Sequence, residues 1–194
     1  MQPLTEKYRP RRIADLLGQP NAVGVLQSFA DEPSPKAFLF SGPTGTGKTS
    51  AALCLAADLG IPVERAELGG LWQIASGEQT AESVRQAVAD LRVRPWEGSG
   101  WRILIVNECD RISEGAAYVW LDVLEKLPDQ SVVVFTTNSP ERIPQRLRDR
   151  CEHVAFNSSP ADVRHGIEQL VAKVWWEELG SREPPTMEAL GLAA

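Results

Sequence analysis

The segment GPTGTGKT, residues 42–49, limits what this chain can fold into more than any other feature. It fits the pattern G-x-x-x-x-G-K-[ST] at every fixed position. A short apolar run precedes it at residues 37–41, and Leu55 and Leu59 follow at helical spacing. In such a unit the glycines let the loop curl, so that its backbone N–H groups face phosphate oxygens at the start of a helix. The segment therefore predicts a strand, a phosphate-binding loop and a helix in succession.

Apolar runs and helical patterns alternate along the rest of the chain. Short apolar runs bounded by turn residues predict strands near residues 37–41, 72–75, 102–106, 131–137 and 154–156. Helical spacing predicts helices near residues 22–29, after residue 48, from about 79 to 91, after residue 113 and from residue 160. The best strands are continuously apolar, which is typical of a parallel sheet covered on both faces. The pattern predicts an α/β fold.

Polar residues follow the predicted strands at 102–106 and 131–137. Ligands of parallel sheets bind beyond the carboxyl ends of the strands, so these residues are expected to converge on one site. Asn107 takes the position at which an aspartate usually helps to hold magnesium, and Glu108 comes next as a general base. A strand slipped by one residue would place Glu108 on the metal and leave Cys109 as a chemically poor base. Asn138, after a third strand, is expected to contact the γ-phosphate or to orient the attacking water.

The expected ligands of the phosphate loop are ATP and Mg²⁺. Lys48 is expected to reach the β- and γ-phosphates, and the Thr49 hydroxyl to ligate magnesium. The residues expected to bind nucleotide here are Gly42, Pro43, Thr44, Gly45, Thr46, Gly47, Lys48, Thr49 and Ser50. Asn107 is expected to hold the ion through a water molecule, because Mg²⁺ usually keeps several waters. Since the amide lacks the charge of an aspartate, weaker magnesium binding and slower hydrolysis are expected, with ATP binding retained.

Bulk properties exclude several other classes of protein. A chain of 194 residues is one large domain, or one domain and a fragment of a second. Its net charge of −6 does not indicate a strongly basic nucleic-acid binder. Three widely spaced cysteines favour reduced thiols in a cytosolic protein over a zinc site or a disulfide framework. No signal peptide or membrane span is expected, since no apolar run is long enough.

Three segments, in order, resemble one family. EKYRPRRIADLLGQ, residues 6–19, resembles the N-terminal box of clamp-loader ATPases such as replication factor C and the bacterial clamp loader. The phosphate loop and the acidic end of the strand at 103–106 come next. IPQRLRDRCEHVAF, residues 143–156, resembles the segment that carries the Ser-Arg-Cys motif of that family. The resemblance covers about residues 4–160.

The resemblance implies a fold and a function. The fold is an AAA+ P-loop domain, a five-stranded parallel sheet with helices on both faces, over residues 1–158. A partial helical lid or C-terminal extension is expected over residues 159–194. The activity implied is ATP-dependent opening and loading of a ring-shaped sliding clamp at primer–template junctions. The implied partners are other clamp-loader-like subunits, as a homo- or hetero-oligomer, the sliding clamp and primer–template DNA, with no membrane. The implied location is the cytoplasm, near the nucleoid of a prokaryote or in a virus-infected cell.

The resemblance also assigns roles to residues outside the loop. Tyr8, Arg9 and Pro10 would lie near the adenine. Arg150 would act as an arginine finger on the ATP of a neighbouring subunit, where it stabilises the charge of the transition state. The serine of the Ser-Arg-Cys motif is replaced by Asp149, which is expected to pair with an adjacent arginine and restrain the finger. Cys151 is expected to be a packed small residue.

Three functions are consistent with these sequence features. The first is an active clamp-loader-like ATPase. The second is an ATP-binding structural subunit that does not hydrolyse ATP itself, while Arg150 serves a neighbour. The third is another DNA motor, such as a Holliday-junction branch-migration ATPase. The EKYRP segment and the Arg-Cys pair favour a clamp loader over the third, and Asn107 is the residue on which the first two differ.

Overall fold

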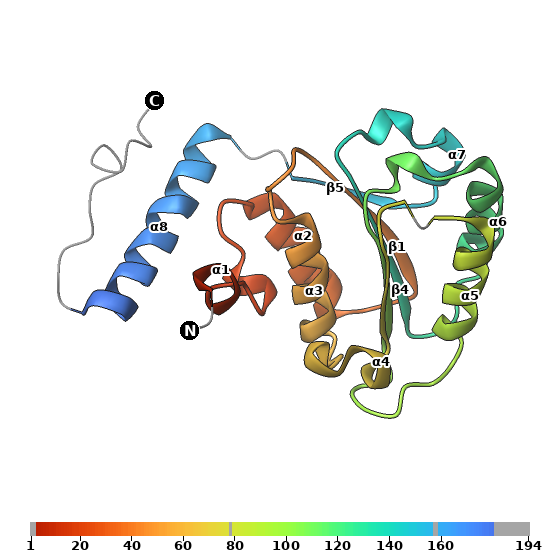
Figure 1. Ribbon diagram of the computed structural model, residues 1–194, viewed down its shortest axis with the longest axis horizontal. Coiled ribbons are helices and arrows are strands. Elements are labelled where there is room, and N and C mark those ends of the chain that lie inside the picture. The colour runs from red at the N-terminus through yellow and green to blue at the C-terminus, as the bar shows by residue number, and fades with distance from the viewer. Residues whose placement is uncertain (1–2, 78, 157–158, 181–194) are drawn as a thin grey trace.

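A computed structural model describes residues 3–77, 79–156 and 159–180 of the chain. Its strands form one parallel five-stranded sheet in the order β2-β3-β4-β1-β5 (Figure 1). The strands are β1 (Lys36–Ser41), β2 (Leu71–Ile74), β3 (Arg102–Val106), β4 (Ser131–Thr137) and β5 (Glu152–Ala155). β1 lies between β4 and β5 and is therefore not an edge strand. The loop that follows β1 is flanked by the ends of both neighbouring strands. The predicted α/β fold with a five-stranded parallel sheet is confirmed.

Helices connect the strands. They are α1 (Leu4–Lys7), α2 (Pro20–Asp31), α3 (Lys48–Asp58), α4 (Ala66–Gly69), α5 (Ala81–Leu91), α6 (Glu114–Glu125), α7 (Gln145–Arg148) and α8 (Pro160–Leu179). Local sequence explains where the long helices begin. Pro20 occupies the first turn of α2, and the side chains of Thr80 and Ser113 accept backbone N–H groups at the starts of α5 and α6. No helix in the described part of the chain is long and apolar enough to span a membrane.

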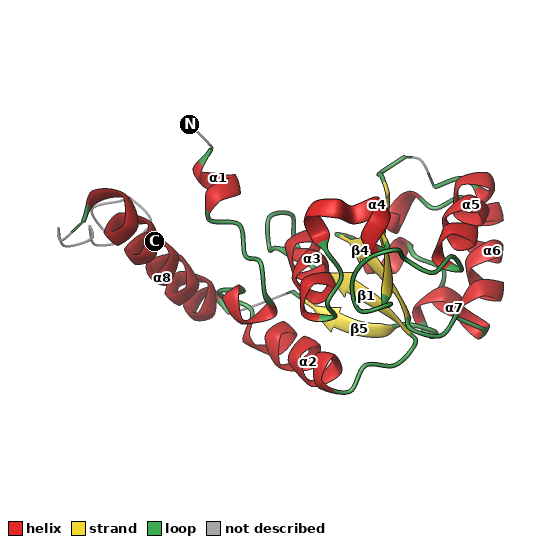
Figure 2. Cartoon of the chain, turned by 90° about the horizontal axis from the view of Figure 1, so that it is seen from below, coloured by secondary structure: helices red, strands yellow, loops and turns green. Residues whose placement is uncertain are grey.

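Two hydrophobic cores lie on opposite faces of the sheet. Phe38 and Phe40 of β1 point to the core under α2 and α3, whereas Leu39 points to the core under α5 and α6, because successive side chains of a strand alternate. Trp120 of α6 is fully buried and meets the Phe135 ring edge-on, with ring centroids 4.9 Å apart. Figure 2 shows the strands lying between the two helical layers. Helices therefore cover both faces, as the continuous apolar runs predicted.

The edge strands differ slightly from the sequence prediction. β5 begins two residues earlier and ends one residue earlier than predicted, and β2 is shifted by one residue. The missed part of β5 is polar: Glu152 is exposed and pairs with Lys36 of β1 at 2.7 Å. Edge strands commonly carry charged residues that face solvent. An apolar pattern cannot find such residues, which explains the error.

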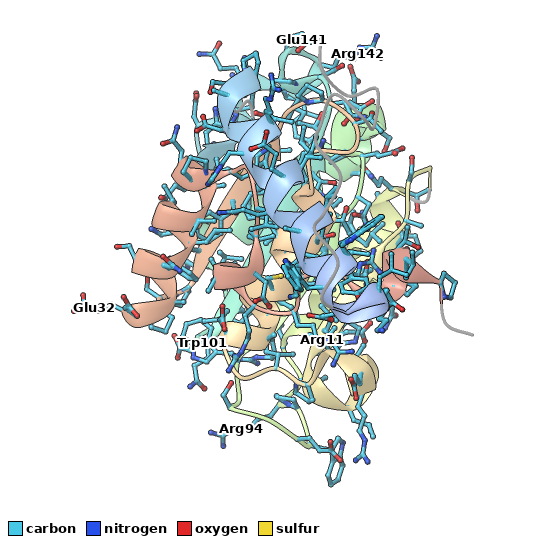
Figure 3. All side chains as sticks on the ribbon, turned by 90° about the vertical axis from the view of Figure 1, so that its left-hand side faces the viewer. Arg11, Glu32, Arg94, Trp101, Glu141 and Arg142 are labelled. Atoms are coloured by element: carbon cyan, nitrogen blue, oxygen red, sulfur yellow. The ribbon has the colours of Figure 1, made fainter. Side chains whose placement is uncertain are left out.

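Helix α8 crosses the N-terminal segment of the chain. It contacts that segment at Gly166, its one buried residue, and at Glu178, which accepts a hydrogen bond from Lys7 at 2.7 Å. A Cβ atom at Gly166 would lie 2.6 Å from the backbone nitrogen of Gly18. Figure 3, with α8 toward the viewer, shows the helix running diagonally across the molecule. The part of the predicted lid or C-terminal extension beyond residue 180 lies outside the described residues, and the division of the chain near residue 158 stays a prediction.

Candidate nucleotide-binding site

The phosphate loop is fixed at its start and open at its centre. Gly42 has φ +149°, and a Cβ atom there would lie 2.3 Å from the carbonyl oxygen of Phe156, so the loop begins packed against the chain after β5. Gly45 and Gly47 have φ values of +84° and +92°, which favour glycine. A Cβ atom at either position would meet no atom within 4 Å. The centre of the loop therefore faces space that a phosphate group can enter.

The tips of three strands meet in one pocket beside this loop. The pocket is lined by Thr44, Gly45, Gly47, Lys48, Thr49, Ser50, Asn107, Glu108, Thr136, Thr137 and Asn138. The strand order explains the convergence, because β3, β4 and β1 are neighbours in the sheet. The structure thus brings Asn107, Glu108 and Asn138 together with six of the nine predicted loop residues. Gly42, Pro43 and Thr46 do not line this pocket. Thr136 and Thr137 were not predicted, because they lie inside a strand that reads as continuously buried.

Lys48 lies at the base of the loop with its ammonium group held by backbone oxygens. Its Nζ atom donates to the carbonyl oxygens of Gly42 and Pro43, each at 2.7 Å. Thr46 also donates to the Pro43 carbonyl, at 2.8 Å. Partial burial lowers the pKa of Lys48, and the carboxylate of Glu108 acts in the opposite direction by favouring the charged form. A cation and a carboxylate therefore face the same pocket.

Hydrogen bonds of its side chain and of its backbone hold Asn107 at the end of β3. The Thr49 hydroxyl donates to Asn107 Oδ1 at 3.1 Å, and Asn107 Nδ2 donates to Gln73 Oε1 at 3.3 Å. The backbone N–H of Asn107 donates to the Ile74 carbonyl at 3.0 Å, and its own carbonyl accepts from Gln79 Nε2 at 2.5 Å. The amide oxygen of Asn107 therefore faces the phosphate loop. Neither glutamine was predicted as a site residue.

Glu108 has a backbone conformation that is unusual for its residue type. Its φ is +50°, in the left-handed region, and its N–H donates to the Thr136 hydroxyl at 3.2 Å. Non-glycine residues adopt this conformation rarely, and such strain is concentrated at functional sites. Cys109 is fully buried, and burial raises the pKa of its thiol. Glu108 rather than Cys109 lines the pocket, so the register is the one expected from the apolar run, not the slipped one.

The side chains present fit a magnesium ion. Mg²⁺ prefers oxygen ligands, and the pocket offers the Thr49 hydroxyl and the Asn107 amide oxygen 3.1 Å apart. Because Thr49 donates its hydrogen to Asn107, the lone pairs of the hydroxyl are available to a cation. Thr49 would bind the ion directly and Asn107 would bind it through water. Both assignments stay predictions.

The three residues expected near adenine lie outside this pocket. Tyr8 donates its hydroxyl hydrogen to Glu178 of α8 at 2.9 Å. Arg9 lies 3.6 Å from Glu6, and the carbonyl of Pro10 lies 3.3 Å from the Cys54 thiol of α3. Arg9 and Pro10 line a separate depression on the outer side of α3. Their contact with adenine stays a prediction.

Arg150 is held by a partner that the sequence did not suggest. Its Nη2 atom donates to Glu125 Oε1 at 2.7 Å, and its Nη1 atom donates to the Arg146 carbonyl at 2.9 Å. Asp149 was expected to pair with Arg148 or Arg150, and for Arg150 this is wrong: its ion pair is with Glu125, at the end of α6. Burial raises the pKa of Cys151 to about 12, as expected for a packed thiol. Packing of α7 against α6 creates the Arg150 pair, which adjacency in sequence cannot reveal.

A family model described as "ATPase family associated with various cellular activities (AAA)" matches residues 38–159. The chain belongs to this AAA family. The match covers the phosphate loop and the tips of β3 and β4, which form the pocket. An AAA assignment supports ATPase chemistry in general and agrees with the predicted fold.

Curated relatives of this AAA chain are replication factor C small subunits. The replication factor C small subunit of Methanococcus vannielii is 28% identical across the whole of this chain, which spans 58% of that protein. The same subunit of Halobacterium salinarum is 28% identical over 78% of this chain and 46% of its own length. The chain thus spans about half the length of the curated relatives it matches. The predicted resemblance to replication factor C is confirmed.

Solved structures show the same fold. A DNA polymerase III gamma subunit-related protein of Thermotoga maritima is 21% identical, with a TM-score of 0.64, covering 89% of this chain and 57% of that one. The Thermotoga maritima RuvB Holliday junction branch migration motor is 18% identical, with a TM-score of 0.63, covering 86% and 54%. At these identities the likeness concerns the AAA fold alone.

Proposed function

We propose that the chain is an ATP-binding subunit of a clamp-loader-like assembly, in which ATP binding and slowed hydrolysis drive the loading of a sliding clamp on DNA during replication or repair. The pocket that joins Lys48, Thr49 and Glu108 carries the ATPase part of this proposal. The similarity of the whole chain to replication factor C small subunits supports the clamp-loading part. The proposed location is the cytoplasm, near the nucleoid of a prokaryote or in a virus-infected cell.

Each pocket residue has a role in this proposal. The N–H groups of the loop and Lys48 bind the phosphates, and Thr49 and Asn107 hold Mg²⁺. When bound, Mg²⁺ neutralises charge that develops on the phosphates. Glu108 accepts a proton from the attacking water, and Asn138, whose side chain is exposed at the tip of β4, orients that water.

Steady-state hydrolysis of ATP by the purified chain tests the enzymatic part. Glu108→Gln keeps the size and hydrogen-bonding capacity of the side chain but removes the base. General bases contribute about 10²–10⁴-fold, so hydrolysis by this variant should fall to background while ATP binding persists. Equal background rates in the unaltered chain and in the variant would defeat the enzymatic reading of the isolated chain.

Asn107 favours a second candidate, a structural subunit that binds ATP without hydrolysing it. The amide that faces Thr49 lacks the charge that strengthens hydrogen bonds to magnesium-bound water. Asn107→Asp restores that charge without changing the size of the side chain. If Asn107 slows the chain, the variant should bind Mg²⁺ more tightly or hydrolyse ATP faster. No change in either quantity would refute this account of Asn107.

The partners are tested by purification from native extract. A clamp loader should co-purify with a sliding clamp and with further clamp-loader-like subunits, and the assembly should bind primer–template DNA. Co-purification with a Holliday-junction branch-migration complex, and with no clamp, would favour the other DNA motor. The likeness to RuvB shows a shared fold and gives that motor no specific support.

A further inference from the structure

Asn138 needs a defined direction if it is to orient the attacking water, and its own side chain does not supply one. That side chain is exposed at the tip of β4, and its amide makes no hydrogen bond within the described ranges of the chain. The direction of such an amide depends on the backbone that carries it. The turn after β4 must therefore set where Asn138 points.

A hydrogen bond across Asn138 closes this turn. The backbone N–H of Ser139 donates to Thr137 Oγ1 at 3.0 Å, so the ring that this bond closes contains the backbone of Asn138. Threonine side chains form such turns by accepting an N–H group from two residues further along. Thr137 is 0% exposed, so water does not compete for the bond. The Thr137 side chain therefore fixes the backbone on both sides of Asn138.

The Asp110 carboxylate determines the direction of the Thr137 hydroxyl, which donates to Asp110 Oδ1 at 3.4 Å. A carboxylate only accepts and a backbone N–H only donates. The hydroxyl must therefore give its hydrogen to Asp110 and keep its lone pairs for Ser139, and this order cannot be reversed. The residues that line the nucleotide pocket do not include Asp110. Asp110 thus supports the turn through Thr137 and not by contact with the nucleotide.

The segment that carries Asp110 also carries the proposed base. Glu108 lies two residues before Asp110, and its backbone N–H donates to Thr136 Oγ1 at 3.2 Å. Thr136 and Thr137 are adjacent in β4, so their side chains leave opposite faces of the strand. β4 therefore holds the segment after β3 at two points. These two contacts set the distance between Glu108 and Asn138, which act on one water in the proposed reaction.

We propose that Asp110 is a positioning residue for hydrolysis, which acts through Thr137 on the turn that directs Asn138 at the attacking water. The role rests on the proposed function, since it concerns the rate of ATP hydrolysis. Loss of the Asp110 carboxylate should lower kcat and leave ATP binding in place, because the phosphate loop and Lys48 are not altered.

Hydrogen exchange of the Ser139 amide tests the turn in the absence of ATP. Thr137→Val removes the hydroxyl at nearly constant size, and Asp110→Ala removes the carboxylate that orients it. In both variants the Ser139 amide should exchange about two- to tenfold faster, the change that one hydrogen bond supports. Thr137→Ser keeps the hydroxyl and should restore the protection. Unchanged exchange in Asp110→Ala would overturn the role of Asp110.

Steady-state hydrolysis and ATP binding by the full chain test the catalytic part. Asp110→Ala and Thr137→Val should each lower kcat by about tenfold, because a reacting group that is misplaced by a fraction of an ångström loses rate on this scale. The double variant should lose no more than the larger single effect, since both residues act on one turn. Losses that multiply in the double variant, or ATP binding that weakens with kcat, would overturn the proposal in favour of a general effect on packing.

The decisive comparison repeats Asp110→Ala in the Asn138→Ala background. There it should not lower kcat further, because the amide that the turn directs has been removed. An equal loss in both backgrounds would overturn the proposal, since Asp110 would then act on some other part of the site. Faster Ser139 exchange with unchanged kcat would overturn the catalytic role of the turn alone. Absence of hydrolysis by the unaltered chain would overturn the enzymatic part of the proposed function and the effect on kcat together, while Ser139 exchange would still show whether Asp110 holds the turn.

Discussion

Two glycines inside helices should respond to alanine in opposite ways. Gly24 lies within α2, where a Cβ atom would meet nothing within 4 Å. Gly166 lies within α8, where a Cβ atom would stand 2.6 Å from the nitrogen and 2.9 Å from the Cα of Gly18. Both obstructing atoms are backbone, so they cannot move aside as the end of a flexible side chain can. Gly24→Ala should stabilise the protein, and Gly166→Ala should weaken the docking of α8.

The magnitude follows from two opposing effects. Alanine is better than glycine inside a helix by about 1 kcal/mol, and this gain applies at both positions. Forcing a methyl group into a filled contact costs about 1–3 kcal/mol, and this cost applies at Gly166 alone. Since the helix gain cancels between the variants, they should differ by about 1–3 kcal/mol. The docking of α8 should be weakened by up to about 2 kcal/mol.

Two measurements check this prediction. Urea unfolding should show Gly24→Ala more stable than the unaltered chain by about 0.5–1 kcal/mol. Hydrogen exchange of the α8 amides should be faster in Gly166→Ala, by up to roughly 30-fold, because most of the stability of a helix in a protein comes from its tertiary packing. Slower exchange of α8 in Gly166→Ala would refute the close backbone contact, because the contact would then cost less than the roughly 1 kcal/mol gained from helix propensity.

Three further predictions concern Arg150, Gly42 and Cys54. Glu125→Gln should free Arg150 from a partly exposed ion pair worth about 0.2–1 kcal/mol. The ATPase rate at a neighbour's site in the assembly should then rise by up to about fivefold, whereas Arg150→Ala should lower it. Unchanged rates in both variants would contradict the trans role. Gly42→Ala should lower the Tm more than Gly45→Ala, because only the former places a Cβ atom 2.3 Å from a carbonyl oxygen; equal Tm values would speak against that contact. Burial raises the pKa of Cys54 from about 9 to about 12, so the unfolded thiol ionises first. The free energy of unfolding should therefore fall as pH rises from about 9 toward 12, and Cys54→Ala should reduce the slope; identical slopes would contradict this.

Much of the fold follows from local patterns in the sequence. A continuous apolar run such as Ile103–Val106 identifies a buried parallel strand, because both faces of that strand are covered. The run also sets the register, so Asn107 and Glu108 fall at the strand tip as the sequence predicts. The polar start of β5 was missed because an edge strand needs no apolar residues there.

The sequence by itself determined the phosphate loop, the strand that leads into it and the order of polar residues at the strand tips, because each depends on neighbours along the chain. The tertiary structure alone decided which side chains support that site. Gln73 meets Asn107 because β2 pairs with β3, and Glu125 meets Arg150 because α6 packs against α7. Hydrogen bonds and ion pairs between distant positions impose no spacing on the sequence, so the pattern of a single sequence does not predict them.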